Sequence, residues 1–417
     1  MTSRTGDWLV RRAAHGSVPR LWMGKRRLIY LLGSEANEMI FANDDKFRVR
    51  EAFVALEIVD GPTSVVLSDG PDHARRRALV RPSVAPRRID GYLATMAESA
   101  DEELDSAPTR FDAYAAMRSA IRRSTLRTLF GEALGARADE IGEMLQPLLD
   151  LADVLPQTVA WKQRLRTPAW RRGISARTAI NQFIAAEIDR IRRVPADDAS
   201  SSPMLHTLVH GRDGAGSGLS DEEIRDQAVT MIAAGYETTS AAMGWAVYLL
   251  GAHPTWQQRV RAEISDVLGE SAPGPTDLPR LSLTGAVITE ALRLYPPAMI
   301  SARFVVEGFD FRGTAVRPGD LVIYSPYATH RYPSVYDDPT RFRPDRWIEQ
   351  PRRPIGEYVP FGGGAHRCLG SHLALAELTV MLARLLARGP FELRRAPSRA
   401  RGYAAMRPAP GVEIEFV

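Results

Sequence analysis

The chain has 417 residues and a net charge of +4, with 45% apolar and 25% charged side chains. This composition is that of an ordinary soluble globular protein and excludes collagen-like, coiled-coil and disordered chains. The single cysteine, Cys368, excludes an intrachain disulfide and a cysteine-rich zinc module, and it favours a reducing, cytoplasmic compartment. At about 150 residues per domain, the length alone favours about three domains.

The charge pattern and the N-terminus indicate neither nucleic acid nor a membrane span. The basic residues form no stripe and belong to no recognised nucleic-acid-binding module, so we expect no nucleic acid partner. The first residues, MTSRTGDWLVRRAAHG, hold no apolar stretch typical of a signal peptide. The longest uncharged run, residues 238–258, has an apolar part of about 15 residues, whereas a membrane span needs about 20.

The predicted elements are mostly helices with a few short strands. Residues 26–32 predict a strand and residues 34–42 a short helix. Helical patterns dominate from 72 to 193, with breaks at Pro86, Pro108, Pro156 and Pro168. Residues 195–220 are rich in Ser, Gly and Asp and predict a surface loop around a short helix. Later in the chain we expect helices over 254–269, 284–295 and 369–388, and strands over 304–307, 321–324, 391–395 and 412–417.

A long helix is predicted at the centre of the chain. Ser220 and Glu223 form a capping box, in which each side chain accepts from the other residue's backbone N–H. The apolar pattern continues to about Gly251, and about thirty residues at 1.5 Å each span roughly 45 Å. A helix that is apolar on most faces must be buried. The segments before and after the 195–220 loop should therefore share one core.

The cysteine lies in a glycine-rich loop that leads directly into an apolar helix. In VPFGGGAHRCLGSHLALAELTVML, Gly362, Gly363 and Gly364 precede Cys368. A thiol at a helix N-terminus lies near free N–H groups, which stabilise the thiolate. A phosphate-binding loop is excluded because no Gly-Lys-Ser/Thr closes it, and no protease signature surrounds the cysteine. A buried, inert cysteine is the plainer alternative, but it does not explain the glycines.

Four positions of this loop resemble the haem-binding loop of the cytochrome P450 family. Phe361, Gly364, Cys368 and Gly370 fit its pattern F-x-x-G-x-x-x-C-x-G. The resemblance implies that the protein binds haem b and that the Cys368 thiolate is the proximal ligand of the iron. A thiolate ligand pushes electron density onto iron and favours O–O cleavage.

Two further segments resemble a charged network of that family. Glu290 and Arg293 lie three residues apart in ITEALRLYPPA, in a helix that Tyr-Pro-Pro ends. By itself such a pair predicts only a solvated surface contact. Its apolar flanks resemble the family's E-x-x-R motif, and Arg346 of FRPDR resembles the arginine that completes the network. The resemblance implies a buried structural network that supports the haem loop.

The middle of the long helix reads Ala234-Gly-Tyr-Glu-Thr238. Thr238 can bond back to the carbonyl of Ala234, which loosens or bends a helix. The glycine alone suits a close helix crossing equally well. The segment resembles the family's oxygen-binding helix, A-G-x-E/D-T. The resemblance implies that Thr238 and Glu237 are catalytic and organise proton delivery during dioxygen activation.

Several basic side chains are candidates for holding carboxylates. His73 and Arg77 lie on one face of a predicted helix, which by itself predicts only a solvated basic helix start. The family's bacterial members use H-x-x-x-R at this place for haem propionates, and Arg303 and His366 resemble further haem contacts. All these motifs occur in family order, so the resemblance covers about residues 25–417.

The resemblance implies one triangular haem domain over residues 1–417, mainly α with a minor β region, in place of three domains. It implies an oxidoreductase, a haem-thiolate monooxygenase that uses dioxygen to hydroxylate or otherwise oxidise a lipophilic small molecule. The chain has no room for a fused reductase, so we expect electrons from NAD(P)H through a separate ferredoxin or flavodoxin with its reductase, docking near Arg367. By family analogy the substrate pocket includes Ala233, Ala234, Ala298, Met299 and Ile300.

Three alternatives stay open at this point. The first is a peroxide-driven haem-thiolate enzyme, against which the intact Glu237–Thr238 pair argues. The second uses the same iron for desaturation, C–C coupling or rearrangement in natural-product biosynthesis, that is, in secondary metabolism. The third is a non-catalytic haem sensor or electron carrier, which would not need Thr238 and Glu237.

Residues 161–177 interleave tryptophan and arginine. The simplest interpretation is a solvated connection between two helices. The same composition also suits contact with a membrane or with a carrier protein.

Overall fold

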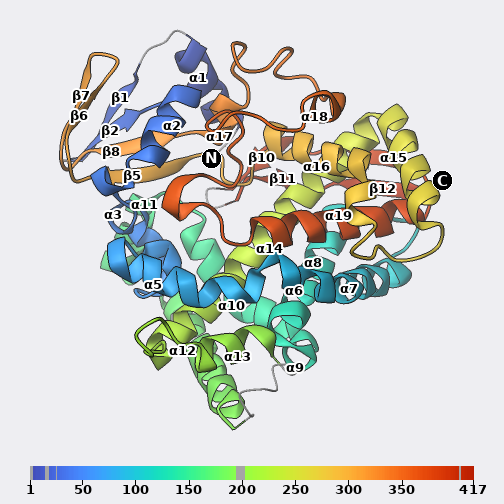
Figure 1. Ribbon diagram of the computed structural model, residues 1–417, viewed down its shortest axis with the longest axis horizontal. Helices are drawn as coiled ribbons and strands as arrows, with labels where there is room; N and C mark the ends of the chain where they lie inside the picture. The colour runs from blue at the N-terminus through green and yellow to red at the C-terminus, as the bar shows by residue number, and fades with distance from the viewer. Residues whose placement is uncertain (1–2, 15–17, 25, 194–201, 403–404) are drawn as a thin grey trace.

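The computed structural model describes residues 3–14, 18–24, 26–193, 202–402 and 405–417. Its outline is roughly triangular, with most strands at one corner, a few short strands toward the side of the C-terminus and helices over the rest (Figure 1). The mainly helical architecture with a minor β region confirms the predicted fold class. The α-helices of the described residues are α1 Ser3–Ala14, α2 Ser34–Ala42, α3 Arg50–Phe53, α4 Glu57–Asp60, α5 Gly70–Val80, α6 Pro86–Ile89, α7 Leu93–Ser106, α8 Ala113–Phe130, α9 Glu132–Gly135, α10 Ala138–Ala152, α11 Pro156–Arg164, α12 Pro168–Ile191, α13 Pro203–His210, α14 Asp221–Ala252, α15 Pro254–Leu268, α16 Ser282–Leu294, α17 Pro326–Thr329, α18 Asp345–Glu349 and α19 Ser371–Ala387.

The main sheet joins three strands near the N-terminus to two strands from residues 301–324. Its order is β1-β2-β8-β5-β3, with β2 and β8 parallel and the other neighbours antiparallel. All four side chains of β8 are buried, as expected for a central strand. The strands are β1 Arg20–Met23, β2 Arg26–Tyr30, β3 Phe47–Arg48, β4 Arg110–Asp112, β5 Ser301–Val305, β6 Phe309–Phe311, β7 Thr314–Val316, β8 Leu321–Tyr324, β9 Phe391–Arg395, β10 Arg399–Arg401, β11 Arg407–Ala409 and β12 Glu413–Phe416.

The central helix α14 confirms the prediction from the capping box. The Ser220 hydroxyl accepts from the Glu223 N–H at 3.2 Å, and the Glu223 carboxylate accepts from the Ser220 N–H at 2.9 Å. The helix packs against α8, α12, α16 and α19. One apolar cluster includes α14 and extends from Val59 to Ile414, so segments before and after the predicted loop share a core. Of that loop, residues 194–201 lie outside the described residues, and α13 is its short helix.

Element boundaries differ from the predictions where a distant residue decides them. The strand expected over 304–307 is β5, which begins at Ser301 because Ser301 pairs with Tyr324 of β8. The helix expected over 284–295 is α16, which begins at Ser282. The Glu263 carboxylate from α15 accepts from the N–H groups of Leu283 and Thr284 at 2.6 and 2.8 Å and so caps its first turn.

One segment of the described chain, residues 364–387, is long and apolar enough to cross a membrane by composition alone. However, 61% of its apolar window is buried inside the fold. It contains α19, which packs against α7, α14, α15 and α16. This is the environment of a core helix, so the segment is weak support for a membrane span.

Candidate active site

The cysteine loop is packed against the end of α2. Gly364 has φ 68°, and a Cβ there would lie 2.9 Å from the Phe41 carbonyl oxygen. A Cβ on Gly363 would lie 2.3 Å from the Phe41 ring. Asp44 anchors the loop by accepting from the Ala365 N–H at 2.6 Å. The glycines therefore serve a close approach of backbone to backbone as well as a positive φ.

Cys368 lies where this loop ends, three residues before α19 begins. Its N–H donates to the Phe361 carbonyl at 2.9 Å, which closes the loop between two predicted positions. The residue is solvent-exposed. Protein atoms nevertheless surround the thiol on most sides, and this burial raises its pKa, despite the Gly370 N–H and the charges of Arg77 and Arg367, which favour the thiolate.

The groups expected to favour the thiolate are present, namely the Gly370 N–H and the charges of Arg77 and Arg367. Desolvation of the sulfur outweighs them. In these surroundings the thiolate needs a further stabilising group. A metal cation bound directly to sulfur is such a group, because a coordinating thiol is deprotonated outright. The residues present thus fit a thiolate-ligated metal.

Four predicted cationic or potentially cationic side chains converge beside the loop. The His73 and His366 rings stack with centroids 4.0 Å apart. Burial and then the charges of His73, Arg303 and Arg77 lower the pKa of His366 to about 3. Burial, followed by the charge of Arg77, also lowers the pKa of His73. Near neutral pH both imidazoles are therefore uncharged, so Arg77 and Arg303 carry the positive charge of the cluster, and Asp69 lies 3.9 Å from Nε2 of His366.

Two arginines of this cluster differ in how they are held. Arg77 donates to the Arg367 carbonyl at 2.7 Å, which ties α5 to the cysteine loop. Arg303 is buried on β5, and its Nη1 donates to the Ala302 carbonyl at 2.8 Å. Among the described residues, no hydrogen-bond partner lies near the buried Nε of Arg303. A buried, unpartnered guanidinium N–H is costly unless an anion completes it, and the carboxylates of haem are such anions.

The predicted charge network is buried and complete. Arg293 donates to both carboxylate oxygens of Glu290 at 2.8 Å, and Arg346 donates to one at 3.1 Å. The Trp347 indole N–H adds a bond of 2.8 Å. Burial alone would raise the pKa of Glu290, but the hydrogen bond and charge of Arg293, with the charge of Arg346, lower it.

This network is connected to the start of the cysteine loop. Arg293 donates to the His330 carbonyl at 2.7 Å. Nε2 of the same histidine accepts from the Val359 N–H at 2.9 Å. Val359 lies two residues before Phe361, so a short chain of bonds joins the buried ions to the loop.

The central segment of α14 contains the predicted back-bonds. The Thr238 hydroxyl donates to the Ala234 carbonyl at 2.9 Å, and the Thr239 hydroxyl donates to the Gly235 carbonyl at 2.8 Å. A Cβ on Gly235 would lie 2.9 Å from Cγ2 of Thr125 on α8. The alternative for this glycine, a close helix crossing, is therefore correct. Ala234 is exposed within an otherwise largely buried helix.

Glu237 has a partner that sequence reasoning missed. It forms an ion pair with Arg118 of α8, whose Nε lies 3.0 Å from Oε1. Arg118 also donates to Gln146 of α10 at 3.0 Å. The carboxylate is thus held at the junction of α8, α10 and α14. No local signal could reveal this pair, because its members are 119 residues apart.

The five residues expected in the substrate pocket differ in their solvent exposure. Ala234 and Ala298 are exposed, and Ile300 is half-buried. Ala233 and Met299 are instead buried, at 6% and 5% exposure. Met299 belongs to an apolar cluster with Trp245 and Tyr327.

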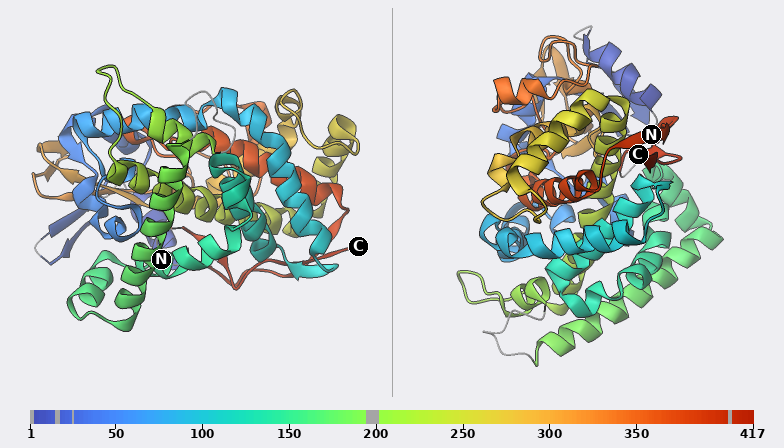
Figure 2. Two further views of the ribbon diagram at one scale, coloured as in Figure 1. Left: turned by 90° about the horizontal axis from the view of Figure 1, so that it is seen from below. Right: turned by 90° about the vertical axis from the view of Figure 1, so that its right-hand side faces the viewer.

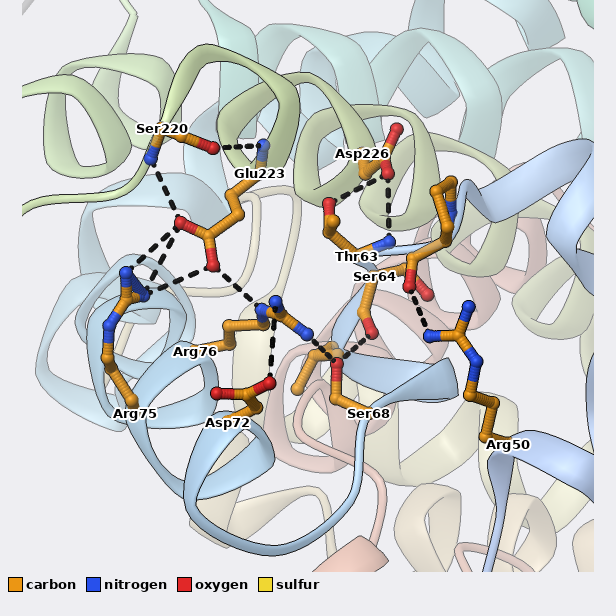
Figure 3. Close-up of polar contacts among 12 residues, drawn as sticks. Arg50, Thr63, Ser64, Ser68, Asp72, Arg75, Arg76, Ser220, Glu223 and Asp226 are labelled. Atoms are coloured by element: carbon orange, nitrogen blue, oxygen red, sulfur yellow. Dashed lines mark hydrogen bonds and ion pairs between the residues drawn. The ribbon is translucent and has the colours of Figure 1, made fainter.

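The structure also shows polar contacts around the start of α14 (Figure 3). Arg75 and Arg76, which the sequence presented as part of a basic run, both donate to Glu223. Asp226 accepts from the Thr63 N–H and hydroxyl at 3.1 and 2.8 Å. The charges of these two arginines therefore hold α5 to α14 and are not free for a ligand.

A second missed residue is Glu377 of α19. It is buried and accepts from the Ser124 hydroxyl of α8 at 2.7 Å. Burial raises the pKa of Glu377 to about 8, although the hydroxyls of Ser124 and Thr125 oppose the shift. The signal was available in the sequence, since a lone acid stands in the apolar run LALAELTVML.

The helical fold, the accessible thiol and the cluster of basic side chains beside it fit the class of haem-thiolate proteins. Residues 10–412 match the family model of cytochrome P450, and the chain therefore belongs to the cytochrome P450 family. Cytochrome P450 139 of Mycobacterium tuberculosis is 44% identical over 403 residues, covering 94% of this chain and 93% of the relative.

Two relatives carry the names of reactions. Cyclooctat-9-en-7-ol 5-monooxygenase of Streptomyces melanosporofaciens is 32% identical and covers 92% of this chain and 84% of its own. Pentalenene oxygenase of Streptomyces avermitilis is 30% identical and covers 90% and 84%. Among solved structures, retinoic acid-bound cyanobacterial CYP120A1 superposes with a TM-score of 0.89 over 98% of this chain and 94% of its own, at 23% identity. Family membership shows an oxygenase and implies haem iron, dioxygen, a redox partner and a small-molecule substrate.

Proposed function

We propose that this P450 binds haem b through Cys368 and inserts one oxygen atom of O2 into a lipophilic small molecule of the terpenoid class. One observation carries the assignment of the haem site. An accessible thiol lies beside Arg77, close to two stacked histidines and to a buried arginine whose Nε has no partner among the described residues.

The chain's own residues hold the haem in two ways. The Cys368 sulfur binds the iron. Arg77, Arg303, His73 and His366 would bind the propionate carboxylates, the two arginines through charge-assisted hydrogen bonds and the two histidines through hydrogen bonds of the neutral ring. Phe361, Gly364 and Gly370 shape the loop, and Glu290, Arg293 and Arg346 hold its start through His330.

Bound haem with a thiolate ligand supplies O–O bond cleavage and the oxidation itself. The protein supplies protons and excludes water. The Thr238 hydroxyl, anchored on Ala234, orients an ordered water, and Glu237 passes protons to it from the junction with Arg118. We assign Arg118 as the positioning residue of Glu237.

The expected pocket favours a substrate with few polar groups. Its residues offer no side-chain hydrogen bonds, which suits an apolar ligand: Ala233, Ala234, Ala298, Met299 and Ile300. Two relatives are named for pentalenene and cyclooctat-9-en-7-ol, which by name are unsaturated cyclic compounds with at most one hydroxyl. We therefore infer a cyclic terpenoid substrate and a role in secondary metabolism.

We further propose one haem domain over residues 1–417, working in the cytoplasm with electrons from NAD(P)H. A separate ferredoxin or flavodoxin and its reductase deliver them to the face around Arg367. The exposed Arg367 of the cysteine loop and the exposed Arg87 of α6, a helix that contacts α19, suit an acidic partner.

The haem assignment is tested by the reduced carbon monoxide complex. The purified, haem-loaded protein should show the red-shifted Soret band of a thiolate ligand. Cys368→Ala should lose this band, whereas His372→Ala, an exposed neighbour on α19, should keep it. A thiolate band that persists in Cys368→Ala would contradict the assignment of Cys368 as the ligand of the haem iron.

The reaction is tested by substrate binding followed by turnover. Cyclic terpenoids should displace the water on the iron and shift the Soret band. With ferredoxin, reductase and NAD(P)H, the product should be heavier by one oxygen atom. A loss of two hydrogens indicates desaturation, and turnover with hydrogen peroxide but not with reductase indicates a peroxide-driven enzyme; either result contradicts the proposal.

A further inference from the structure

Helix α11 and the first turns of α12 form a tip that stands out from the body of the molecule (Figure 2). We call residues 155–174 the α11–α12 tip. Among the described residues, eleven large apolar side chains are exposed, and four of them lie in this short segment. They are Leu155 at 54%, Trp161 at 58%, Leu165 at 56% and Ile174 at 40% exposure. Four such side chains within twenty residues of sequence favour an interaction surface over the scattered single exposures that are normal for soluble proteins.

The charge of this segment has a single sign. No acidic residue occurs between Asp153 and Glu187. Six basic residues do: Lys162, Arg164, Arg166, Arg171, Arg172 and Arg177. Arg177 turns inward to Asp226, with Nη2 at 2.7 Å from Oδ1. No ion pair with a described residue is found for the other five, although arginines elsewhere in the fold are commonly paired.

The combination of exposed tryptophan and leucine with unpaired arginine fits an anionic lipid surface. Trp161 and Leu165 lie four residues apart at the end of α11, with Arg164 between them and Arg166 following. Tryptophan and leucine enter the interfacial zone of a bilayer, while arginine and lysine bind anionic headgroups. A protein partner would instead need a complementary face of about 800 Å² on each side. A projecting tip fits a deformable lipid surface better than it fits such a protein face.

We propose that the α11–α12 tip docks this P450 reversibly on membranes that contain anionic lipid. The basic side chains contact headgroups, and Trp161 with Leu165 enters the interface. The mode is peripheral and needs no membrane-spanning helix. The proposal is independent of the reaction assigned above, because it concerns binding to lipid and not turnover.

The test is co-sedimentation of the full-length, haem-loaded protein with vesicles. One set contains phosphatidylcholine with about one third phosphatidylglycerol, and the other contains phosphatidylcholine alone. Binding should be confined to the anionic vesicles and should fall at high salt, because surface charges are then screened. Trp161→Ser/Leu165→Ser and Arg164→Glu/Arg166→Glu should each weaken binding at least tenfold.

Matched controls separate the tip from general surface effects. Ile355→Ser removes an apolar side chain that is 77% exposed, and Arg399→Glu/Arg401→Glu reverses two exposed charges on β10. Both should bind vesicles like the unaltered protein, and the Soret spectrum verifies that every variant is folded. Equal binding by tip and control variants overturns the proposal. So does the absence of vesicle binding by the unaltered protein, including the case in which an acidic carrier protein binds the tip instead.

Discussion

At the scale of single residues, the ion pair between Glu237 and Arg118 has the most direct consequence for the proposed chemistry. The side chains of both residues are largely shielded from solvent, at 14% and 23% exposure. Such a pair holds the carboxylate in one place more firmly than water would, since a partly buried pair is weakly screened. Arg118 therefore fixes the position of the Glu237 carboxylate, the proposed proton donor.

Replacing Arg118 should impair proton delivery without removing the donor. Glu237→Gln should lower turnover by about 10²–10⁴-fold, the usual contribution of a positioned acid. Arg118→Gln should lower it by a smaller factor and waste NAD(P)H, and Arg118→Lys should restore part of the loss. The measurement is product formed per NAD(P)H consumed, with Arg122→Gln on the same helix as the control.

The double variant Glu237→Gln/Arg118→Gln shows whether Arg118 acts by positioning Glu237 or through an independent effect on turnover. If Arg118 acts through Glu237, the double variant should be no worse than Glu237→Gln alone. Effects that multiply would show that Arg118 contributes by another route.

At the scale of elements, two buried acids show opposite ways of placing a carboxylate between helices. Glu290 of α16 is matched by Arg293 and Arg346 and stays ionised. Glu377 of α19 meets hydroxyls of α8, and burial raises its pKa to about 8. At Glu290, the free energy of unfolding depends on the two arginines that balance its charge. At Glu377, it depends on pH.

Removing the carboxylate of Glu290 should leave two buried arginines without a counter-charge. Glu290→Gln should lower the free energy of unfolding by about 3–5 kcal/mol and reduce haem loading. Urea unfolding of the haem-loaded protein measures the loss. Glu140→Gln breaks the exposed pair with Arg137 and should leave stability nearly unchanged. Equal effects of the two substitutions would contradict a structural role for the network.

Glu377 should make the protein less stable as pH rises. Its folded pKa of about 8 lies above that of an unfolded glutamate, about 4.3, so the folded state binds the extra proton between these values. Its stabilising contribution is full below about pH 4.3 and is lost as pH rises to about 8, by at most about 1.4 kcal/mol per pH unit.

Glu377→Gln keeps a neutral side chain and should remove this slope. In urea unfolding, the free energy of unfolding of the variant should rise relative to that of the unaltered protein between pH 5 and pH 8. A remaining slope of the same sign is expected from Asp60, since burial raises its pKa to about 7. Parallel curves for the two proteins would show that Glu377 is ionised in the folded state.

At the scale of the whole molecule, the proposed haem site joins parts that are distant in the chain. His73 and Arg77 come from α5, Arg303 from the main sheet, and His366 with Cys368 from the loop before α19. Arg77 and Arg303 both act on His366 and place two positive charges in this region, so an anionic ligand bound near them would be stabilised by both. The ligand should therefore contribute to stability as well as to chemistry.

Removing the haem should lower the melting temperature and expose these parts selectively. Amide hydrogens of α5, β5 and the cysteine loop should exchange faster in the haem-free protein, whereas those at the centres of α8 and α10 should change little. Hydrogen exchange with mass spectrometry measures this, and adding haem should restore protection. Uniform loss of protection would indicate that the haem supports the entire core instead.

The sequence by itself determined the family, the capped central helix and the glycine-rich loop that leads through Cys368 into α19. These features rest on local physics: a capping box, proline breaks, apolar periods and a motif of ten residues act over a few positions each. The tertiary structure alone decided that Glu237 pairs with Arg118, that Glu263 caps α16, and that burial outweighs the helix start at Cys368. Each depends on groups brought together from elsewhere in the chain, and neither periodicity nor a motif encodes which distant side chain a fold will place beside a given atom.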